Sequence, residues 1–408
     1  MMPFVNLTAQ REAYREELEA AERAVLDSGC YIGGPEVATL ERELADFCNS
    51  GNSDAGKQGS FAGKDCAEPE TKAIACASGT DALTIALMAL GLKPGDEVIV
   101  PDFTFIAPAE CVAFLGGTPR FADIDPETLL IDPESVRALI GPKTRGIIAV
   151  DLFGQVADFN ELWEIAVAND LWLLEDAAQA FGATFAPWEG ISPNKPWRAG
   201  TIGSISITSF YPSKPLGCYG DGGALFTSDP KLEAKIQQIA NHGSRERYLH
   251  ETVGLNSRLD ALQAAILRVK LRHFESELKV RRENARKYDE FFEEYNAGLR
   301  ASAGAGISGA SAGANIVPQY IKHGCSSTYA QYTVLADDRE TFIKKLDKAG
   351  IPHCIHYPQP LHEQPCFKGL AQGSENRNAI EASKKAVSLP VCAFTDVDFI
   401  INKLRSVL

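Results

Sequence analysis

From Ile74 onward, short apolar runs alternate with patterns typical of amphipathic helices. The apolar runs lie at Val98–Val100, Gly146–Val150 and Leu171–Leu174. The helical patterns lie at Asp81–Leu90 and Phe159–Val167. Such alternation is typical of βαβ units, in which helices cover a mostly parallel sheet. The sequence therefore predicts an α/β fold with a mostly parallel central sheet covered by helices.

Two helices are predicted before this region. The first ends at Gly29, a residue suited to a helix C-cap, and carries apolar residues at helical spacing at Tyr14, Leu18, Ala21 and Val25. The second lies near Glu36–Phe47, after a turn that contains two glycines and a proline. The chain is thus expected to open with helices before its first strand.

A long charged segment, Ser257–Glu294, predicts a helix that links two domains. Its apolar residues fall on one helical face, at Leu259, Leu262, Ile266 and Val269. Beyond it, strands are predicted at Gln331–Leu335 and His353–Tyr357, and helices at Arg339–Ala349 and Val397–Leu404. We therefore expect a large α/β domain over residues 1–255, followed by the linking helix and a smaller C-terminal α+β domain over residues 256–408.

Two segments, residues 49–72 and 301–315, show no periodic pattern and are predicted to be mobile surface loops. The second contains a literal GxGxxG sequence at Gly304–Gly309. A dinucleotide-binding loop of that form must follow a strand and open a helix, and this stretch does neither. No NAD site is predicted there.

Charge and composition exclude several classes of partner. The formal net charge of -14 would repel a nucleic-acid backbone, and no basic patch offsets it. Residues 1–12 lack the features of a signal peptide, and no apolar run approaches the roughly 20 residues of a membrane span. The ten cysteines show no paired metal-ligand spacing, and His353 and His356 lack a third ligand. We expect a cytoplasmic protein that binds no nucleic acid, membrane or metal.

Lys214 is the first candidate catalytic residue. It is the lone lysine of Ser209–Gly223, lies between two expected strands and precedes a glycine-rich turn. In a sparsely charged, partly desolvated place, a lysine has a lowered pKa and can form a Schiff base with a carbonyl carbon. A lysine of a surface turn is the alternative interpretation.

Two further groups stand where a ligand site is expected. Asp176 follows the strand Leu171–Leu174, at the edge where open α/β sheets bind ligands, and can pair with a protonated pyridine nitrogen. Capping a helix is its alternative role. Ala77–Asp81 leads into a helix whose N–H groups, dipole and Thr80 hydroxyl can bind a phosphate, although small residues before a helix are common. Together with a Schiff-base lysine, these are the groups that pyridoxal 5'-phosphate (PLP) requires.

These motifs resemble those of the DegT family of nucleotide-sugar aminotransferases, which have the aspartate-aminotransferase fold (fold type I of PLP enzymes). The resemblance covers nearly the whole chain and is strongest to the branch that aminates UDP-2-acetamido-2-deoxy-3-oxo-D-glucuronate. The stretches Ser209–Gly223, Asn241–Tyr248 and Gly254–Ala265 carry it. Tyr211 favours the same branch, because many other members have a histidine there.

The resemblance implies a role for each matched residue. Lys214 would form the Schiff base with PLP, and Asp176 would pair with the pyridine nitrogen. The other implied cofactor contacts are Gln179 beside the ring hydroxyl, Phe105 stacked on the ring, and Gly79, Thr80 and Ser209 at the phosphate. Asn256 would reach the phosphate of the other subunit's cofactor, so the active unit would be a homodimer with shared active sites.

Three more residues are expected at the substrate. Arg258 is the candidate that grips a carboxylate, and His356 and Tyr31 resemble positions that line the sugar-nucleotide pocket. Several of these residues have simpler alternatives: Phe105 as a core residue, Asn256 as a helix N-cap and Arg258 as an ion-pair partner of Asp260.

The implied reaction transfers the amino group of L-glutamate to C3 of UDP-2-acetamido-2-deoxy-3-oxo-D-glucuronate and releases 2-oxoglutarate, in the synthesis of cell-surface O-antigen sugars. One alternative substrate is a dTDP- or UDP-linked 3- or 4-keto-6-deoxyhexose. An alternative of another class is a non-catalytic, PLP-binding regulator. A PLP-dependent sugar dehydratase is disfavoured, because such relatives have a histidine in place of Lys214.

Overall fold

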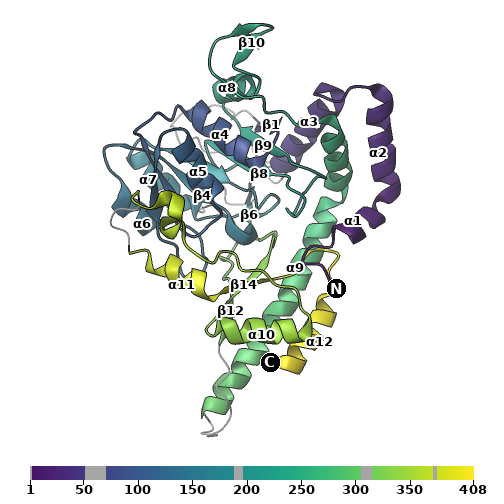
Figure 1. Cartoon of the computed structure of the whole chain (residues 1–408), viewed down its shortest axis with the longest axis vertical. Helices are drawn as coiled ribbons and strands as arrows, with labels where there is room; N and C mark the ends of the chain where they lie inside the picture. The colour runs from purple at the N-terminus through teal and green to yellow at the C-terminus, as the bar shows by residue number, and fades with distance from the viewer. Residues whose placement is uncertain (1, 51–69, 188–195, 305–314, 371–374) are drawn as a thin grey trace.

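A seven-stranded sheet forms the centre of the larger part of the molecule (Figure 1). The structure is a computed structural model that describes residues 2–50, 70–187, 196–304, 315–370 and 375–408. The strands, in order across the sheet, are β1 (Lys72–Cys76), β9 (Gly223–Thr227), β8 (Ile205–Ser209), β5 (Trp172–Asp176), β4 (Thr144–Val150), β2 (Glu97–Pro101) and β3 (Thr118–Ala122). Strand β9 is antiparallel to both of its neighbours, and the other pairs are parallel. The predicted mostly parallel sheet is confirmed.

Helices cover both faces of this sheet, because successive side chains of a strand point to opposite sides. Ile74 and Cys76 of β1 pack on one side with helices α4 (Gly79–Leu90), α5 (Ala107–Phe114) and α8 (Pro230–Ala240). Ala73 and Ala75 pack on the other side with α3 (Gly34–Ser50) and α9 (Ala261–Gly304). Helices α6 (Pro133–Leu139) and α7 (Phe159–Ala168) cover β2, β4 and β5 on that second side. The three layers match the predicted α/β class.

The C-terminal part contains a smaller antiparallel sheet. Its strands are β12 (Ile316–Pro318), β13 (Tyr332–Ala336) and β14 (Ala386–Leu389). The helices around it are α10 (Arg339–Ala349), α11 (Arg377–Lys385) and α12 (Val397–Val407). Residues of α9, α10 and α12 share one apolar core with this sheet. The predicted smaller α+β part is therefore present, and the domain boundary between residues 255 and 256 stays a prediction.

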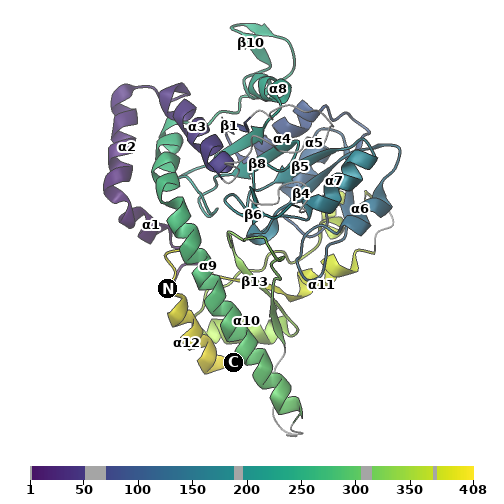
Figure 2. The same ribbon diagram turned by 180° about the vertical axis from the view of Figure 1, so that it is seen from behind.

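The N-terminal helices α1 (Leu7–Ala13) and α2 (Arg15–Ser28) lie along α9 (Figure 2). Leu18 of α2 packs against Ile266 and Val269, and Val25 packs against Ala261. Helix α2 ends at Gly29, which has a φ of 67° in the left-handed region that glycine favours. The predicted opening helix and its C-cap are confirmed.

Three short helices and four two- or three-residue strands complete the described chain. They are η2 (Leu152–Gly154), η3 (Leu361–Glu363), η4 (Pro365–Phe367), β6 (Thr184–Phe185), β7 (Trp197–Arg198), β10 (Ser244–Glu246) and β11 (Leu249–His250). Among the described residues, no helix is both long enough and apolar enough to span a membrane.

Some predicted elements differ from the structure. The strand predicted at His353–Tyr357 is wrong: Cys354 forms one isolated bridge to Ser388, and the segment continues as irregular chain. The linking helix begins at residue 261 and extends to residue 304, so it also takes up the start of the predicted loop at 301–315. Most of that loop, most of the loop predicted at 49–72, and residues 305–309 of the GxGxxG stretch lie outside the described residues.

Candidate active site

A pocket of about 530 Å³ lies where the parallel strands end at their carboxyl edge. Ser78, Gly79 and Thr80 follow β1, Phe105 follows β2, and Asp176 is the last residue of β5. Parallel strands end at the same edge of a sheet, so residues far apart in the chain meet there. The volume is typical of a small-molecule site, for which about 300–1,000 Å³ is usual.

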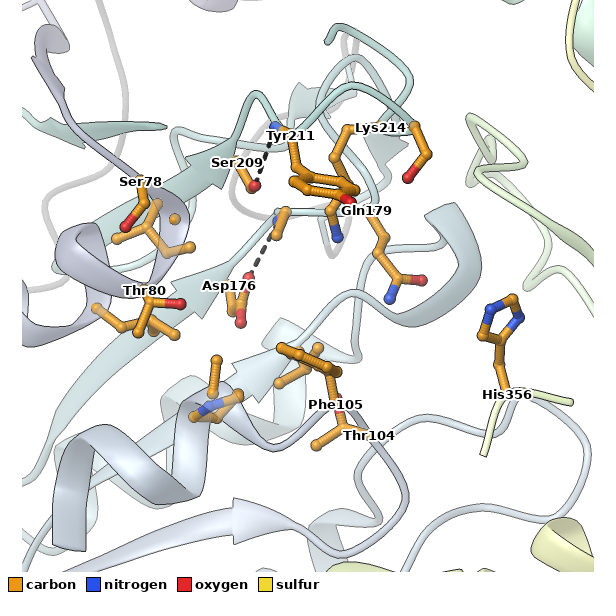
Figure 3. Close-up of a pocket in the computed structure, with 18 of the residues that line it drawn as sticks. Ser78, Thr80, Thr104, Phe105, Asp176, Gln179, Ser209, Tyr211, Lys214 and His356 are labelled. Atoms are coloured by element: carbon orange, nitrogen blue, oxygen red, sulfur yellow. Dashed lines mark hydrogen bonds between the residues drawn. The ribbon is translucent and has the colours of Figure 1, made fainter. Parts of the chain in front are cut away.

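Eight of the predicted site residues line this one pocket. They are Gly79, Thr80, Phe105, Asp176, Gln179, Ser209, Lys214 and His356. In Figure 3, Lys214 and Phe105 lie on opposite sides of the pocket, and Ser78 and Thr80 lie at the end away from His356. The Phe105 side chain is 53% exposed, so its alternative role as a core residue is excluded.

Lys214 and Asp176 are two oppositely charged residues of the pocket, which the exposed Asp221 also lines. Burial lowers the pKa of the Lys214 amine, and Asp176 acts in the opposite direction. Burial also raises the pKa of the Asp176 carboxyl, whereas a hydrogen bond from the Ala178 N–H (3.0 Å) and the charge of Lys214 lower it. A desolvated amine and a desolvated carboxylate therefore face the same space, each available to a group that enters it.

The N-terminus of α4 forms one end of the pocket. The Ser78 hydroxyl accepts a hydrogen bond from the Asp81 N–H at 3.0 Å and caps the helix. The N–H groups of Gly79 and Thr80 precede the first intrahelical bond, so they are available to an anion. A Cβ atom on Gly79 would lie 2.7 Å from the Cβ atom of Ser209, so only glycine allows these two segments to approach so closely. This end of the pocket suits a phosphate.

Gln179 is held in one orientation by hydrogen bonds from three parts of the chain. Its Oε1 accepts the N–H of Phe153 at 2.8 Å, and its Nε2 donates to the Tyr357 hydroxyl at 3.3 Å. The Thr328 hydroxyl donates to the Gln179 carbonyl at 2.8 Å. Phe153 has a positive φ of 61°, a conformation that costs a non-glycine residue energy, and it presents its N–H to Gln179.

His356 closes the far end of the pocket and is uncharged at neutral pH. Its Nδ1 lies 3.0 Å from the hydroxyl of Ser388 on β14. Burial lowers the pKa of His356, and the charge of Lys214 acts in the same direction. The ring can therefore exchange hydrogen bonds with a ligand but adds no positive charge.

Three predicted site residues lie elsewhere, around the start of α9. Tyr31 is half exposed, and its carbonyl accepts the N–H of Ala261 at 2.9 Å. Asn256 and Arg258 are exposed and do not line the pocket of their own chain. Because α9 begins at Ala261, Asn256 is not its N-cap. Arg258 and Asp260 form no ion pair in the structure.

The sequence did not single out several residues that line the pocket. Ser78 could have been found from its capping position three residues before Asp81. Thr104 lies beside Phe105 after β2, and nothing local marks it. Gln331 and Tyr357 also carry no local signal, because their positions depend on how the C-terminal part packs on the sheet. Within the described residues, no cluster of three or more His, Cys, Asp or Glu side chains is placed to hold a metal ion.

Comparison with known proteins places the chain in one protein family. Residues 67–405 match the model of the DegT/DnrJ/EryC1/StrS aminotransferase family. Among curated proteins, the chain is 41% identical to the UDP-2-acetamido-2-deoxy-3-oxo-D-glucuronate aminotransferase of Pseudomonas aeruginosa, over 97% of this chain and 96% of that protein. It is 37% identical to the dTDP-3-amino-3,4,6-trideoxy-alpha-D-glucose transaminase of Streptomyces venezuelae, over 96% and 91% of the two chains.

A solved structure gives the same result. The crystal structure of a DegT DnrJ EryC1 StrS aminotransferase from Brucella abortus superimposes with a TM-score of 0.84 and is 34% identical. The match covers 100% of this chain and 99% of that one. The similarity therefore includes both the large sheet and the C-terminal part.

Proposed function

The chain belongs to the DegT/DnrJ/EryC1/StrS family of PLP-dependent aminotransferases, and on that premise we propose that it aminates C3 of UDP-2-acetamido-2-deoxy-3-oxo-D-glucuronate with L-glutamate as donor. The name of the Pseudomonas aeruginosa relative supports this substrate. The observation that carries the proposal is the desolvated pair Lys214 and Asp176, which faces one pocket at the carboxyl edge of the sheet.

The residues of the pocket fit PLP. Gly79, Thr80 and Ser209 lie together at the anion-binding end, and Asp176 offers a carboxylate without a donor other than the Ala178 N–H. Phe105 offers an exposed aromatic face on the side opposite Lys214 (Figure 3). When bound, PLP supplies an electron sink that lowers the barrier to removing a proton from the carbon next to the amine.

Lys214 carries the proton transfers in the proposed reaction. With its pKa lowered by burial, a larger fraction of its Nζ is uncharged at neutral pH than in an exposed lysine. An uncharged Nζ can attack a carbonyl carbon, and it can then act as general base and general acid for one proton. Asp176 stabilises positive charge at a ring nitrogen by a charge-assisted hydrogen bond.

The proposed substrates also require a cation that this pocket lacks. L-glutamate and a uronate sugar both carry carboxylates, and an unpaired buried carboxylate is costly. Among the described lining residues, Lys214 and His356 are the only basic side chains, and His356 is uncharged at neutral pH. We propose that Arg258 of a second copy of the chain supplies the cation. Asn256 of that second copy would reach the cofactor phosphate. The active unit would then be a homodimer.

A second candidate substrate is a dTDP-linked keto sugar without a carboxylate. The 37% identity to the Streptomyces venezuelae transaminase supports it. In that case Arg258 would meet only the carboxylate of glutamate. A role in O-antigen synthesis, a cytoplasmic location and the non-catalytic alternative stay predictions from the sequence.

The test follows each half-reaction by visible absorbance of the PLP-loaded protein. L-Glutamate alone should bleach the cofactor band, and Lys214→Ala should abolish bleaching, whereas the exposed-lysine control Lys93→Ala should not. A panel of UDP- and dTDP-linked keto sugars should then restore the band, fastest with the 3-oxo-glucuronate. Restoration by dTDP sugars alone would replace the proposed substrate by the second candidate. A protein that binds PLP but is never bleached would contradict a catalytic function.

A further inference from the structure

Two pocket residues present buried polar atoms that have no partner. Seven buried side-chain nitrogen or oxygen atoms lack a hydrogen-bond partner within the described part of the chain. Only two of them belong to residues that line the pocket, Thr104 Oγ1 and Gln331 Oε1. A buried polar atom without a partner costs about 1–3 kcal/mol, so such atoms in native proteins call for an explanation.

These two residues come from different parts of the fold. Thr104 follows β2, precedes Phe105 on the same wall of the pocket (Figure 3) and is 2% exposed. Gln331 immediately precedes β13 of the C-terminal sheet and is half buried. Two unpaired polar atoms on separate elements that line one pocket are better explained by a ligand than by a local packing fault.

The proposed placement of the cofactor assigns its groups to other residues. The phosphate would lie at the N-terminus of α4 and Ser209, and the ring nitrogen and ring hydroxyl would face Asp176 and Gln179. Thr104 and Gln331 therefore remain for the substrate. Both side chains are neutral, and each can donate and accept a hydrogen bond, so they suit a hydroxyl or an amide better than a carboxylate or a phosphate.

We propose that Thr104 and Gln331 form a subsite that binds the neutral polar groups of the sugar ring, a hydroxyl or an acetamido group, in the nucleotide-sugar half-reaction. This inference rests on the proposed function, because it takes a nucleotide sugar as substrate. L-Glutamate has no hydroxyl or amide, so the subsite distinguishes the two substrates that share the pocket. A site of this kind rejects analogues that leave its buried polar groups unpaired.

Binding measurements on the PLP-loaded enzyme test the subsite. The variants are Thr104→Val and Gln331→Met, which keep shape and remove hydrogen bonding. The probes are UDP-2-acetamido-2-deoxy-D-glucuronate, UDP-D-glucuronate and UDP, with dTDP-D-glucose and dTDP in parallel. Each variant should weaken the sugar nucleotides about tenfold relative to the free nucleotide. A loss confined to the acetamido sugar identifies the acetamido group, and an equal loss for both uronates identifies a hydroxyl.

Thermal unfolding separates recognition from a structural role. Thr104→Val should leave the melting temperature unchanged or raise it, because the hydroxyl it removes has no partner. Its matched control is Thr227→Val on β9, a buried threonine whose hydroxyl donates to the Ser204 carbonyl at 3.1 Å. The control should lower the melting temperature by a few degrees and leave sugar affinity intact. Thr104→Ser should restore affinity.

Two outcomes would overturn the subsite. One is a loss of affinity that is equal for sugar nucleotide and free nucleotide. The other is a Thr104→Val variant that is destabilised like Thr227→Val while its sugar affinity is normal. Failure of the proposed function has a different signature: the wild-type enzyme itself would then bind the nucleotide sugars no more tightly than free UDP or dTDP, whatever the variants do.

Discussion

The buried carboxylate of Asp102 accepts two hydrogen bonds from His362, one from the backbone N–H at 2.8 Å and one from the ring Nδ1. Asp102 follows β2 and lies three residues before Phe105, whereas His362 belongs to η3 in the C-terminal part. Asn376, just before α11, donates to the same carboxylate at 2.8 Å. The carboxylate therefore ties the C-terminal segment to the strand end that carries one wall of the pocket.

This contact predicts a pH-dependent stability. The hydrogen bond to Asp102 is the main reason that the pKa of His362 is raised, Glu363 and Asp123 add to it, and burial opposes it. A histidine whose pKa is raised on folding stabilises the protein fully below its unfolded pKa of about 6.5, and loses that contribution as pH rises through the folded pKa. His362→Leu should cost about 2 kcal/mol at pH 6 and less at pH 8.5, measured by urea unfolding.

The exposed His323 provides the control for that measurement. His323→Leu should change the free energy of unfolding little. A cost of His362→Leu that is independent of pH would mean that the ring contributes packing alone and that its protonation is not linked to folding.

Two buried acids, Glu175 and Asp151, predict unequal costs for two similar amide substitutions. Glu175 accepts the N–H groups of Gly200 and Ile202 on its two oxygens, both at 3.0 Å, so Glu175→Gln would place an NH₂ against an N–H. Asp151 accepts the Ala157 N–H at 2.9 Å on Oδ1 and no N–H on Oδ2. Burial and the charge of Glu175 raise the pKa of Asp151 well above its usual value. Asp151→Asn should cost less than about 1 kcal/mol, and Glu175→Gln about 2 kcal/mol or more.

Denaturant unfolding at pH 7 measures both variants under one condition. Equal losses in the free energy of unfolding would indicate that the two carboxyls share their proton evenly. A larger loss for Asp151→Asn would assign the proton to Glu175.

The buried Lys270 of α9 predicts a rise of stability with pH. Its Nζ donates to the Gly217 carbonyl at 2.7 Å and lies 4.4 Å from the centre of the Tyr219 ring, three and five residues after Lys214. Burial lowers its pKa to about 8. The unfolded lysine holds its proton to about pH 10.4, so the unfolded chain binds more protons between those values and stability rises with pH.

Lys270→Met should remove the rise of stability with pH. It should also reduce kcat, because the segment after Lys214 loses a hydrogen bond worth about 1 kcal/mol. Guanidinium unfolding at pH 7.5 and 9.5 measures the first effect, and the absorbance change with L-glutamate measures the second. The exposed Lys279 of the same helix gives the matched control, Lys279→Met, which should behave like wild type. A wild-type stability that is flat from pH 7.5 to 9.5 would contradict the buried, low-pKa lysine.

The periodic elements could be predicted from the sequence because burial imposes a period on the chain. Helix α10 has the predicted bounds, and α2, α4 and α7 lie within a few residues of theirs. The meeting of Thr80, Asp176 and Ser209 at one pocket follows from the same prediction. Asp176 and Ser209 end their strands, Thr80 lies in the helix that follows β1, and these strands end at one edge of the sheet.

Contacts between distant segments could not be predicted in this way. Asp102 and His362 are separated by 260 positions, and neither belongs to a repeated pattern. His353–Tyr357 alternates like a strand, yet it has one bridge to β14 and places His356 and Tyr357 at the pocket. The side-chain oxygens of Thr104 and Gln331 lack hydrogen-bond partners in the folded chain, and a sequence does not record partners.

The close approach of Gly79 to Ser209 predicts a specific loss of cofactor binding. In Gly79→Ala the new Cβ would lie 2.7 Å from the Ser209 Cβ and 3.1 Å from its Oγ, so one of the two phosphate-binding segments must move. We expect PLP affinity to fall about tenfold or more, which corresponds to about 1.4 kcal/mol, in an absorbance titration of the apo-protein. Gly141→Ala is the control, because its Cβ meets open space and its φ is not positive. Unchanged PLP affinity in Gly79→Ala would place the phosphate away from the N-terminus of α4. Lys214 and Asp176 would then have to account for cofactor binding without that helix.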